Sequence, residues 1–181
     1  MELQDREAKG IRRGRLGLIK PETRRGYILL CTLLWSTITF LLAQHFVLST
    51  VVVEGESMLP TLKPGNICLV NCWLPFFRGY RRGDIVVVRD RERGELMIKR
   101  VVGLPSDSIQ VRRGQVYING RPLTEAYLPS QTYTAPREMR NRTFAIARDC
   151  YFVLGDNRPV SDDSRSYGAV NRSDLMGLVS R

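Results

Sequence analysis

The sequence predicts a mainly β fold: an antiparallel, partly closed sheet domain that follows one N-terminal transmembrane helix. Two observations support this prediction. The segment 27–47 contains 21 residues without a formal charge when His45 is neutral. The chain after it is divided into short β-branched runs, which Gly, Asp and Asn separate as turns. We therefore expect a basic cytoplasmic tail over 1–26, the helix over 27–47 and a β-rich domain over 48–181.

The tail and the helix follow from charge and length. Residues 1–26 carry eight Lys/Arg against four Asp/Glu and show no periodicity. As a helix, 27–47 would be about 31 Å long, which matches the hydrocarbon core of a bilayer. It is longer than the core of a cleaved signal peptide, and it is apolar all round, unlike a buried core helix. The basic tail predicts a cytoplasmic N-terminus, so the chain crosses the cell membrane once and the β domain is extracytoplasmic.

The β domain is expected to contain seven strands joined by tight turns. These strands are 51–53, 67–70, 84–89, 96–102, 108–111, 115–118 and 151–154. Asn119-Gly120 predicts a hairpin after the sixth strand. Residues 124–148 predict an irregular excursion, within a smaller subdomain of about 106–148.

Charge and cysteine content restrict the partners. The net charge of +10 is compatible with nucleic acid or a membrane surface, but no nucleic-acid-binding motif accompanies it. We expect a lipid bilayer and no nucleic acid. Cys68 and Cys72 would lie about 13 Å apart in a straight strand, so a disulfide needs a turn between them, and this pairing stays open. Their spacing, without further Cys or His, is not a zinc site, and we expect no metal.

One loop is unusually apolar. It runs from Trp73 to Tyr80. Two interpretations are open: an ordinary contribution to the core, or a segment whose Trp73, Phe76 and Phe77 dip into the bilayer interface.

Ser57 is the first candidate for chemistry. It lies in a tight turn between Gly55 and Pro60, close behind the apolar segment. A hydroxyl presented on such a turn is well placed to be a nucleophile, although a solvated turn serine is the ordinary alternative. The single histidine, His45, excludes a Ser-His-Asp triad and a multi-histidine metal site. A base other than histidine is therefore required.

Lys99 is the candidate for that base. Strand alternation places Met97, Lys99 and Val101 on one face of an otherwise apolar strand. Burial among such neighbours lowers the pKa of a lysine towards neutrality, and a neutral amine can take a proton from a serine hydroxyl. The alternative is a strand-edge lysine whose ammonium reaches water. Only four of the 28 basic residues are lysine, and arginine does not deprotonate in proteins.

A polar segment supplies candidate supporting residues. It covers residues 155–168 and follows an apolar strand. Ser161 is placed to orient the lysine amine, with Asp163 and Arg165 bracing the loop as an ion pair. A generic surface loop is the other interpretation of this segment.

Four motifs together resemble the ordered boxes of type I signal peptidases. They are GESMLPTL over 55–62, GDIVVV over 83–88, IKRVVGLPSD over 98–107 and GDNRPVSDDSR over 155–165. The resemblance covers about four-fifths of the chain. Gly55 stands where the Gram-negative pattern has a serine, which makes the chain similar to the compact, single-span Gram-positive and organelle-type members.

The resemblance implies a membrane-bound serine endopeptidase that cleaves signal peptides from exported preproteins after small residues, on a Ser-Lys protease fold. Ser57 corresponds to the nucleophile and Lys99 to the general base. Ser161 matches the residue that orients the lysine, and the polar residues bracing the site are Asp156, Asp163, Arg100 and Arg165. The expected lining of the shallow substrate pockets is Val53, Met58, Leu62, Met97 and Ile98. No metal or cofactor is implied.

Three other functions remain open at this point. A self-cleaving Ser-Lys repressor would carry a DNA-binding domain in place of the apolar segment. A specialised pilin- or conjugation-type processing peptidase would differ only in its substrate. A non-enzymatic, membrane-anchored β domain that binds lipid is the alternative from another class.

Overall fold

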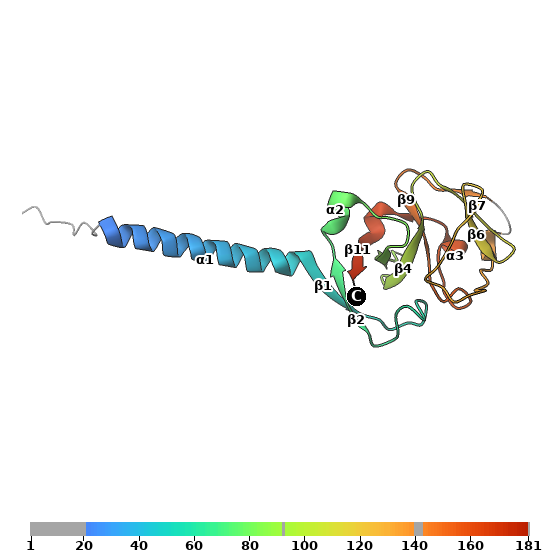
Figure 1. Cartoon of the computed structure of the whole chain (residues 1–181), viewed down its shortest axis with the longest axis horizontal. Helices are drawn as coiled ribbons and strands as arrows, with labels where there is room; N and C mark the ends of the chain where they lie inside the picture. The colour runs from blue at the N-terminus through green and yellow to red at the C-terminus, as the bar shows by residue number, and fades with distance from the viewer. Residues whose placement is uncertain (1–20, 92, 140–142, 181) are drawn as a thin grey trace, which may run out of the picture. The chain divides into compact units, whose positions relative to one another are not determined.

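The computed structural model of the chain describes residues 21–91, 93–139 and 143–180 (Figure 1). It divides into two compact units, Met1–Ala43 and Gln44–Arg181. Most of the expected basic tail, residues 1–20, lies outside the described residues. The described part of the first unit is helical, and the second unit holds both β-sheets.

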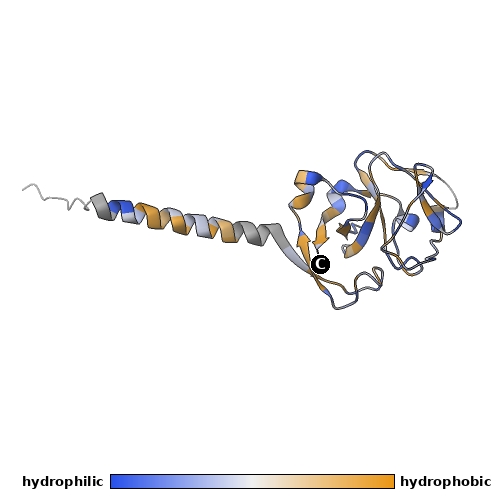
Figure 2. Cartoon of the chain, in the orientation of Figure 1, coloured by the Kyte–Doolittle hydropathy of each residue, from blue (hydrophilic) through white to orange (hydrophobic). Residues whose placement is uncertain are grey.

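The described part of the first unit belongs to helix α1 (Pro21–Val47), whose last residues, from Gln44 onward, fall in the second unit. Figure 2 shows an apolar middle, and no charged residue occurs from Tyr27 to Leu41. The hydroxyls of Thr32, Thr37 and Thr39 donate hydrogen bonds to carbonyls three or four residues earlier in the same helix. Within the described residues, no helix has the length and apolarity needed to cross a membrane. Residues 27–47, the expected span, are therefore helical in the structure. Their insertion in a membrane stays a prediction.

The larger sheet of the second unit has seven strands, and every pairing in it is antiparallel. In spatial order they are β1 (Leu48–Val52), β2 (Ile67–Asn71), β11 (Leu175–Ser180), β3 (Ile85–Arg89), β4 (Leu96–Gly103), β9 (Cys150–Leu154) and β10 (Val170–Asn171). The prediction of a mainly β, antiparallel fold is confirmed.

The smaller sheet has four strands. Their order is β7 (Arg121–Pro122), β6 (Gln115–Ile118), β5 (Ser108–Arg112) and β8 (Phe144–Ala145). The predicted hairpin joins β6 to β7, and both of its turn residues have positive φ, 50° at Asn119 and 79° at Gly120. Such angles are typical of the type I′ turn that an Asn-Gly pair favours.

Short helices connect the strands. They are α2 (Leu74–Arg78), α3 (Ser164–Tyr167) and two 3-10 turns, η1 (Arg137–Met139) and η2 (Arg172–Asp174).

The core lies on both faces of β4. Val101 packs into a cluster with Val86 of β3, whereas its neighbour Val102 packs into a cluster with Ile109 of β5. Each of these side chains is fully buried. Because successive strand residues face opposite sides, the polar residues before them on β4, Lys99 and Arg100, also enter the interior.

The apolar loop does not join the core as a whole. Phe76 and Phe77 are 78% and 79% exposed, so the core interpretation is wrong for both. Tyr80 alone in this segment is a buried aromatic residue, and its hydroxyl donates to the carbonyl of Leu175 at 3.0 Å. The contact of this loop with a bilayer stays a prediction.

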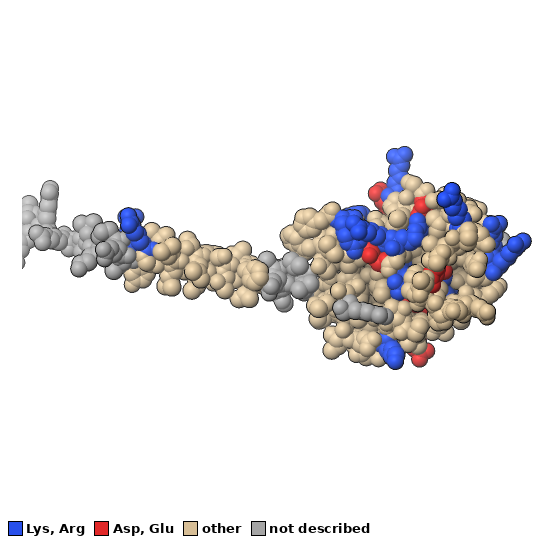
Figure 3. All heavy atoms as spheres, viewed as in Figure 1, with Lys and Arg blue, Asp and Glu red and all other residues tan. Residues whose placement is uncertain are grey.

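The cysteine pairing left open by the sequence is absent: Cys68 and Cys72 are free thiols rather than a disulfide. Lys and Arg side chains are spread over the visible face of the domain with Asp and Glu between them (Figure 3).

Candidate active site

Ser57 lies in a turn that packs against the core through the next residue, Met58. The neighbouring Met58 is 1% exposed and packs with Val53, Leu62 and Cys68. Backbone hydrogen bonds close the turn, from Leu62 N–H to the Met58 carbonyl at 2.9 Å among them. Ser57 itself keeps intermediate exposure. A rigid turn therefore presents a hydroxyl that solvent and a ligand can both reach.

The segment after β9 fixes the other side of this turn. Asn157 N–H donates to the carbonyl of Ser57 at 2.9 Å, and Asn157 Nδ2 donates to the carbonyl of Glu56 at 3.1 Å. A Cβ on Gly155 would lie 2.5 Å from the Ser57 carbonyl oxygen and 2.2 Å from Ser161 Oγ. Only a glycine lets these two oxygens approach the backbone so closely.

Lys99 is buried beside Ser161. Its side chain is on β4, where Lys99 is 3% exposed, and Nζ lies 3.3 Å from Ser161 Oγ. Ser161 is 1% exposed and adjoins Gly155, which in turn adjoins the Ser57 carbonyl. Ser161 thus contacts Lys99 on one side and, on the other, lies against Gly155 next to the Ser57 backbone.

The surroundings of Lys99 favour a neutral amine. Burial lowers the pKa of Lys99 below the ordinary lysine value of 10.5, because loss of hydration destabilises the ammonium form. The negative charges of Asp163 and Asp162 oppose this shift in pKa, whereas the positive charges of Arg165 and Arg137 add to it. Desolvation dominates, so the net direction of the pKa shift is downward.

A buried ion pair shapes the loop that carries Ser161. Asp163 Oδ1 accepts from Arg165 Nε at 2.8 Å, and both side chains are fully buried. Asp163 also accepts from Gly155 N–H, and Arg165 donates to the Ser161 carbonyl at 3.3 Å. Asp163 caps α3 through Arg165 N–H. The expected pairing of Asp163 with Arg165 is present, and it braces both ends of the loop.

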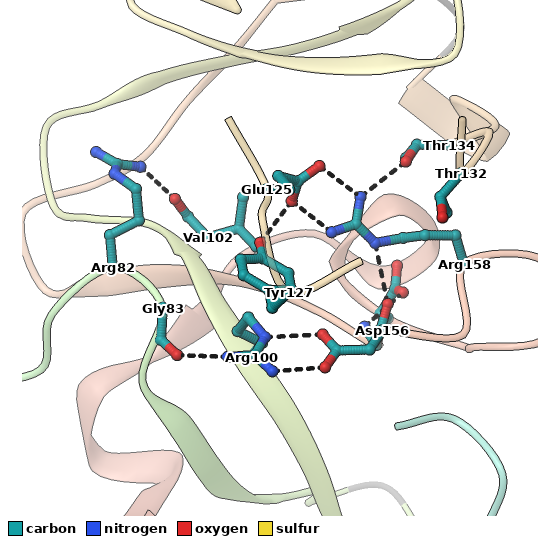
Figure 4. A network of polar contacts seen from close by, with 12 residues as sticks. Arg82, Gly83, Arg100, Val102, Glu125, Tyr127, Thr132, Thr134, Asp156 and Arg158 are labelled. Carbon is teal, nitrogen blue, oxygen red and sulfur yellow. Dashed lines mark hydrogen bonds and ion pairs between the residues drawn. The ribbon is translucent and has the colours of Figure 1, made fainter. Parts of the chain in front are cut away.

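A second buried pair joins β4 to the same loop. Arg100 Nε donates to Asp156 Oδ1 at 2.8 Å, and both side chains are nearly inaccessible. The Arg100 guanidinium lies 4.0 Å from the centre of the Tyr127 ring (Figure 4). Sequence reasoning found Arg100 and Asp156 but missed Tyr127.

Figure 4 shows a third pair that sequence reasoning also missed. Arg158 Nη1 donates to Glu125 Oε2 at 3.0 Å and to Thr134 Oγ1 at 2.7 Å. Tyr127 donates its hydroxyl to Glu125 at 2.6 Å. Because Arg158 also donates to the Gly155 carbonyl, the excursion after β7 is tied directly to the loop beside Ser57.

A hollow of about 640 Å³ contains both Ser57 and Lys99 in its lining. Four of the five residues expected to contact substrate line it as well: Val53, Met58, Met97 and Ile98. Leu62 does not; it is 2% exposed and packs beneath the turn. One wall of the hollow is formed by residues 51–55 with Ser57 and Met58, and the other by residues 95–99.

The site is equipped for acyl transfer by its own side chains. It offers a turn hydroxyl, a buried amine of lowered pKa and a concave apolar surface. Among the described residues, no group of three or more His, Cys, Asp or Glu side chains could hold a metal ion.

Comparison with known proteins agrees with the four motifs. A family model described as signal peptidase, peptidase S26, matches residues 25–181. A signal peptidase I P of Bacillus subtilis subsp. natto is 34% identical over 152 residues, which cover 81% of this chain and 82% of that protein. A signal peptidase I of Bacillus caldolyticus is 39% identical over 144 residues, covering 74% and 78%. A crystal structure of a signal peptidase I from Enterococcus faecalis, 33% identical, covers 56% of this chain and 97% of its own with a TM-score of 0.49.

The close approach at Gly155 predicts the effect of a single methyl group. Gly155→Ala should lower the free energy of unfolding by about 1–3 kcal/mol, since Cβ would collide with Ser161 and with the Ser57 backbone. Gly55→Ala is the matched control, because its Cβ would meet nothing within 4 Å and the change should stay within about 0.5 kcal/mol. Urea unfolding of the full chain in mild detergent measures both. Equal midpoints for the two variants would contradict the close approach.

Proposed function

Because the chain belongs to the signal peptidase family, peptidase S26, we propose that it is a membrane-anchored endopeptidase that removes signal peptides from exported preproteins with Ser57 as nucleophile and Lys99 as general base. The observation that carries this proposal is the buried Lys99 amine, which contacts Ser161 and lines one hollow with Ser57. Of the two lysines in residues 48–181, Lys63 is exposed and Lys99 is not. A desolvated lysine beside a turn hydroxyl is an arrangement suited to base catalysis.

The first half of the reaction forms an acyl-enzyme. Neutral Lys99 Nζ takes the proton from Ser57 Oγ as this oxygen bonds to the carbonyl carbon of the residue before the cut. The resulting ammonium then gives its proton to the nitrogen of the leaving chain, and the C–N bond breaks. Ser161 holds the amine in position throughout, since its hydroxyl lies 3.3 Å from Nζ.

The second half of the reaction restores the enzyme. Lys99 takes a proton from water, whose oxygen attacks the acyl carbon. The bond from that carbon to Ser57 Oγ then breaks, and Lys99 returns the proton to the serine. The negative oxygen formed in each half needs hydrogen-bond donors. With Gly55 two residues before the nucleophile, we assign this role to backbone N–H groups, chiefly that of Ser57.

The substrate is proposed to bind as an added strand. β1 is at one end of the larger sheet, so in the described part of the chain its outer edge is unpaired. β4 pairs with β9 from Arg100 to Gly103, and no described residue pairs with the β9-facing edge of β4 at Leu96–Ile98. These two edges border the hollow, and main-chain groups on either side can bind an extended peptide. Val53, Met58, Met97 and Ile98 then meet the substrate side chains.

The same proposal includes a membrane anchor formed by residues 27–47, with the catalytic domain outside the cytoplasm. The uncharged sequence of this segment supports it. So do the threonine hydroxyls that bond to carbonyls of their own helix, because an unpaired hydroxyl is costly in hydrocarbon. An anchored enzyme meets a substrate whose signal segment is held in the same bilayer, which raises its effective concentration.

The two assigned catalytic side chains can be tested by matched substitutions. Ser57→Ala and Lys99→Met should each lower the rate of preprotein cleavage at least about a thousandfold, since each removes one member of a dyad that works as a unit. Methionine keeps the volume of Lys99 in its buried site. Lys63→Met is the control, because it removes the exposed lysine and should leave the rate unchanged. Full activity in either dyad variant would refute the assignment.

The lowered pKa of Lys99 predicts a pH dependence. The base must be neutral, so kcat/KM should rise with pH through an acidic limb that lies below the ordinary lysine value of 10.5. Asp162 raises the pKa of Lys99, and therefore Asp162→Asn should move this limb to lower pH.

Asp149→Asn provides the control for that shift. Its carboxylate is exposed and is not among the main charges acting on Lys99, so the limb should stay in place. The measurement is the pH profile of peptide cleavage. A shift of the limb to higher pH in Asp162→Asn would contradict the electrostatic role described above.

The proposed topology is tested by protease accessibility in spheroplasts. A C-terminal tag on the full chain should be digested by protease added outside, while an N-terminal tag should survive. The reverse pattern, or release of the chain by alkaline carbonate, would overturn the anchor.

A further inference from the structure

A second hollow, of about 670 Å³, opens beside the Ser57 turn. Its apolar lining residues are Leu59, Pro60, Pro129, Tyr133, Ala135 and Pro159. None of the lining residues is shared with the hollow that contains Lys99. Met58 lines the first hollow and Leu59 lines the second, so the turn separates the two.

The second hollow is continuous with the catalytic turn. Pro60 follows Ser57 by three residues, which places this wall within about 10 Å of the Ser57 Cα. Asn157, on another wall, binds the Ser57 carbonyl directly. A peptide bound as proposed above would lie between the two walls of the first hollow and reach Ser57. Leu59 and Pro60 follow Ser57 and Met58 on the other side of the turn, so the second hollow is open to a chain that continues past the cut bond.

The walls of the second hollow are fixed before any ligand binds. A Cβ on Gly114, whose φ is +77°, would lie 2.4 Å from the Tyr133 ring, so this ring rests on bare backbone. Thr134 N–H donates to the Gly114 carbonyl at 2.9 Å. Arg165 and Arg137 donate to the carbonyls of Ala135 and Pro159 respectively. Binding there would cost little ordering entropy.

The chemistry of the second hollow is apolar. Its acidic lining residue, Asp156, is 2% exposed and is paired with Arg100. Tyr133 is 65% exposed, so its ring is accessible to a ligand in the hollow. An apolar side chain would cover this ring, whereas a charged one would lose hydration without gaining a partner.

We propose that the second hollow binds an apolar side chain from the first few residues on the mature side of the cut bond. This inference rests on the proposed function, and it adds a specificity determinant beyond the cleaved bond. An extended residue spans about 3.4 Å, so the first three or four mature residues are within reach.

Peptide cleavage by the full chain tests this assignment. The probes share one signal-side sequence, with alanine before the cut, and carry Leu, Ser or Asp at each of the first four mature positions in turn. In the wild type, kcat/KM should be about tenfold higher for Leu than for Asp at one or two positions. Tyr133→Ser should reduce that ratio to threefold or less while cleavage of the Ser peptides is retained.

Two further variants sharpen the test. Val160→Ser removes an exposed apolar side chain next to Pro159 in the 155–165 loop, and Val160 does not line the second hollow, so the tenfold ratio should remain. Tyr133→Asp should reverse the preference, and peptides with Lys at the same position should become better substrates than those with Leu. An unchanged ratio in Tyr133→Ser, or an equal loss on all peptides, would overturn the assignment.

The outcomes also separate this inference from the proposed function. A wild type that cuts every peptide equally well would disprove the mature-side site and leave the peptidase intact. A wild type that cuts none of them would disprove both.

Discussion

The removal of one amine from water is the constraint on which the catalytic domain depends. Lys99 pairs with Val86 on β3, and beyond Arg100 the strand β4 continues with two fully buried valines, Val101 and Val102. Its lowered pKa means that the unfolded chain binds more protons than the folded one as pH falls below 10.5. The resulting loss of stability is complete below the lowered pKa and disappears as pH rises above 10.5. The sheet must supply that stability elsewhere, and cores on both faces of β4 do so.

The neighbouring charges partly cancel, so burial has the largest effect on the pKa of the Lys99 amine. Asp163 alone would favour the ammonium form of Lys99. Arg165 binds both oxygens of that carboxylate, and its own charge acts on the pKa of Lys99 in the opposite direction. The pair therefore braces the Ser161 loop with little net charge towards the amine. Removing either partner would leave an uncompensated buried charge, at a cost of about 3–5 kcal/mol.

The sequence predicted most of this structure, and its failures have identifiable physical causes. All seven expected strands are present, because each is a β-branched run next to a turn. β11 was missed although it lies between β2 and β3, since Gly177 argues against a strand. In the fold this glycine is required: a Cβ there would lie 2.7 Å from Val70. Ser57 and Lys99 could be nominated because histidine and lysine are scarce, but the pairing of Glu125 with Arg158 joins residues 33 positions apart and left no local signal.

The contacts that could not be predicted from the sequence join the excursion after β7 to the site. The Glu125 carboxylate binds Arg158, and the face of the Tyr127 ring packs against the Arg100 guanidinium. Arg158 in turn holds the Gly155 carbonyl, the point at which Ser57 and Ser161 approach each other. A displacement of the excursion must therefore move the 155–165 loop. The Arg158 guanidinium is buried, and the loss of its hydrogen-bond partners would carry a large cost in free energy. The loop also contributes to the second hollow through Asn157 and Pro159. The position of the Lys99 amine and the walls of the second hollow thus depend on the same few buried arginines.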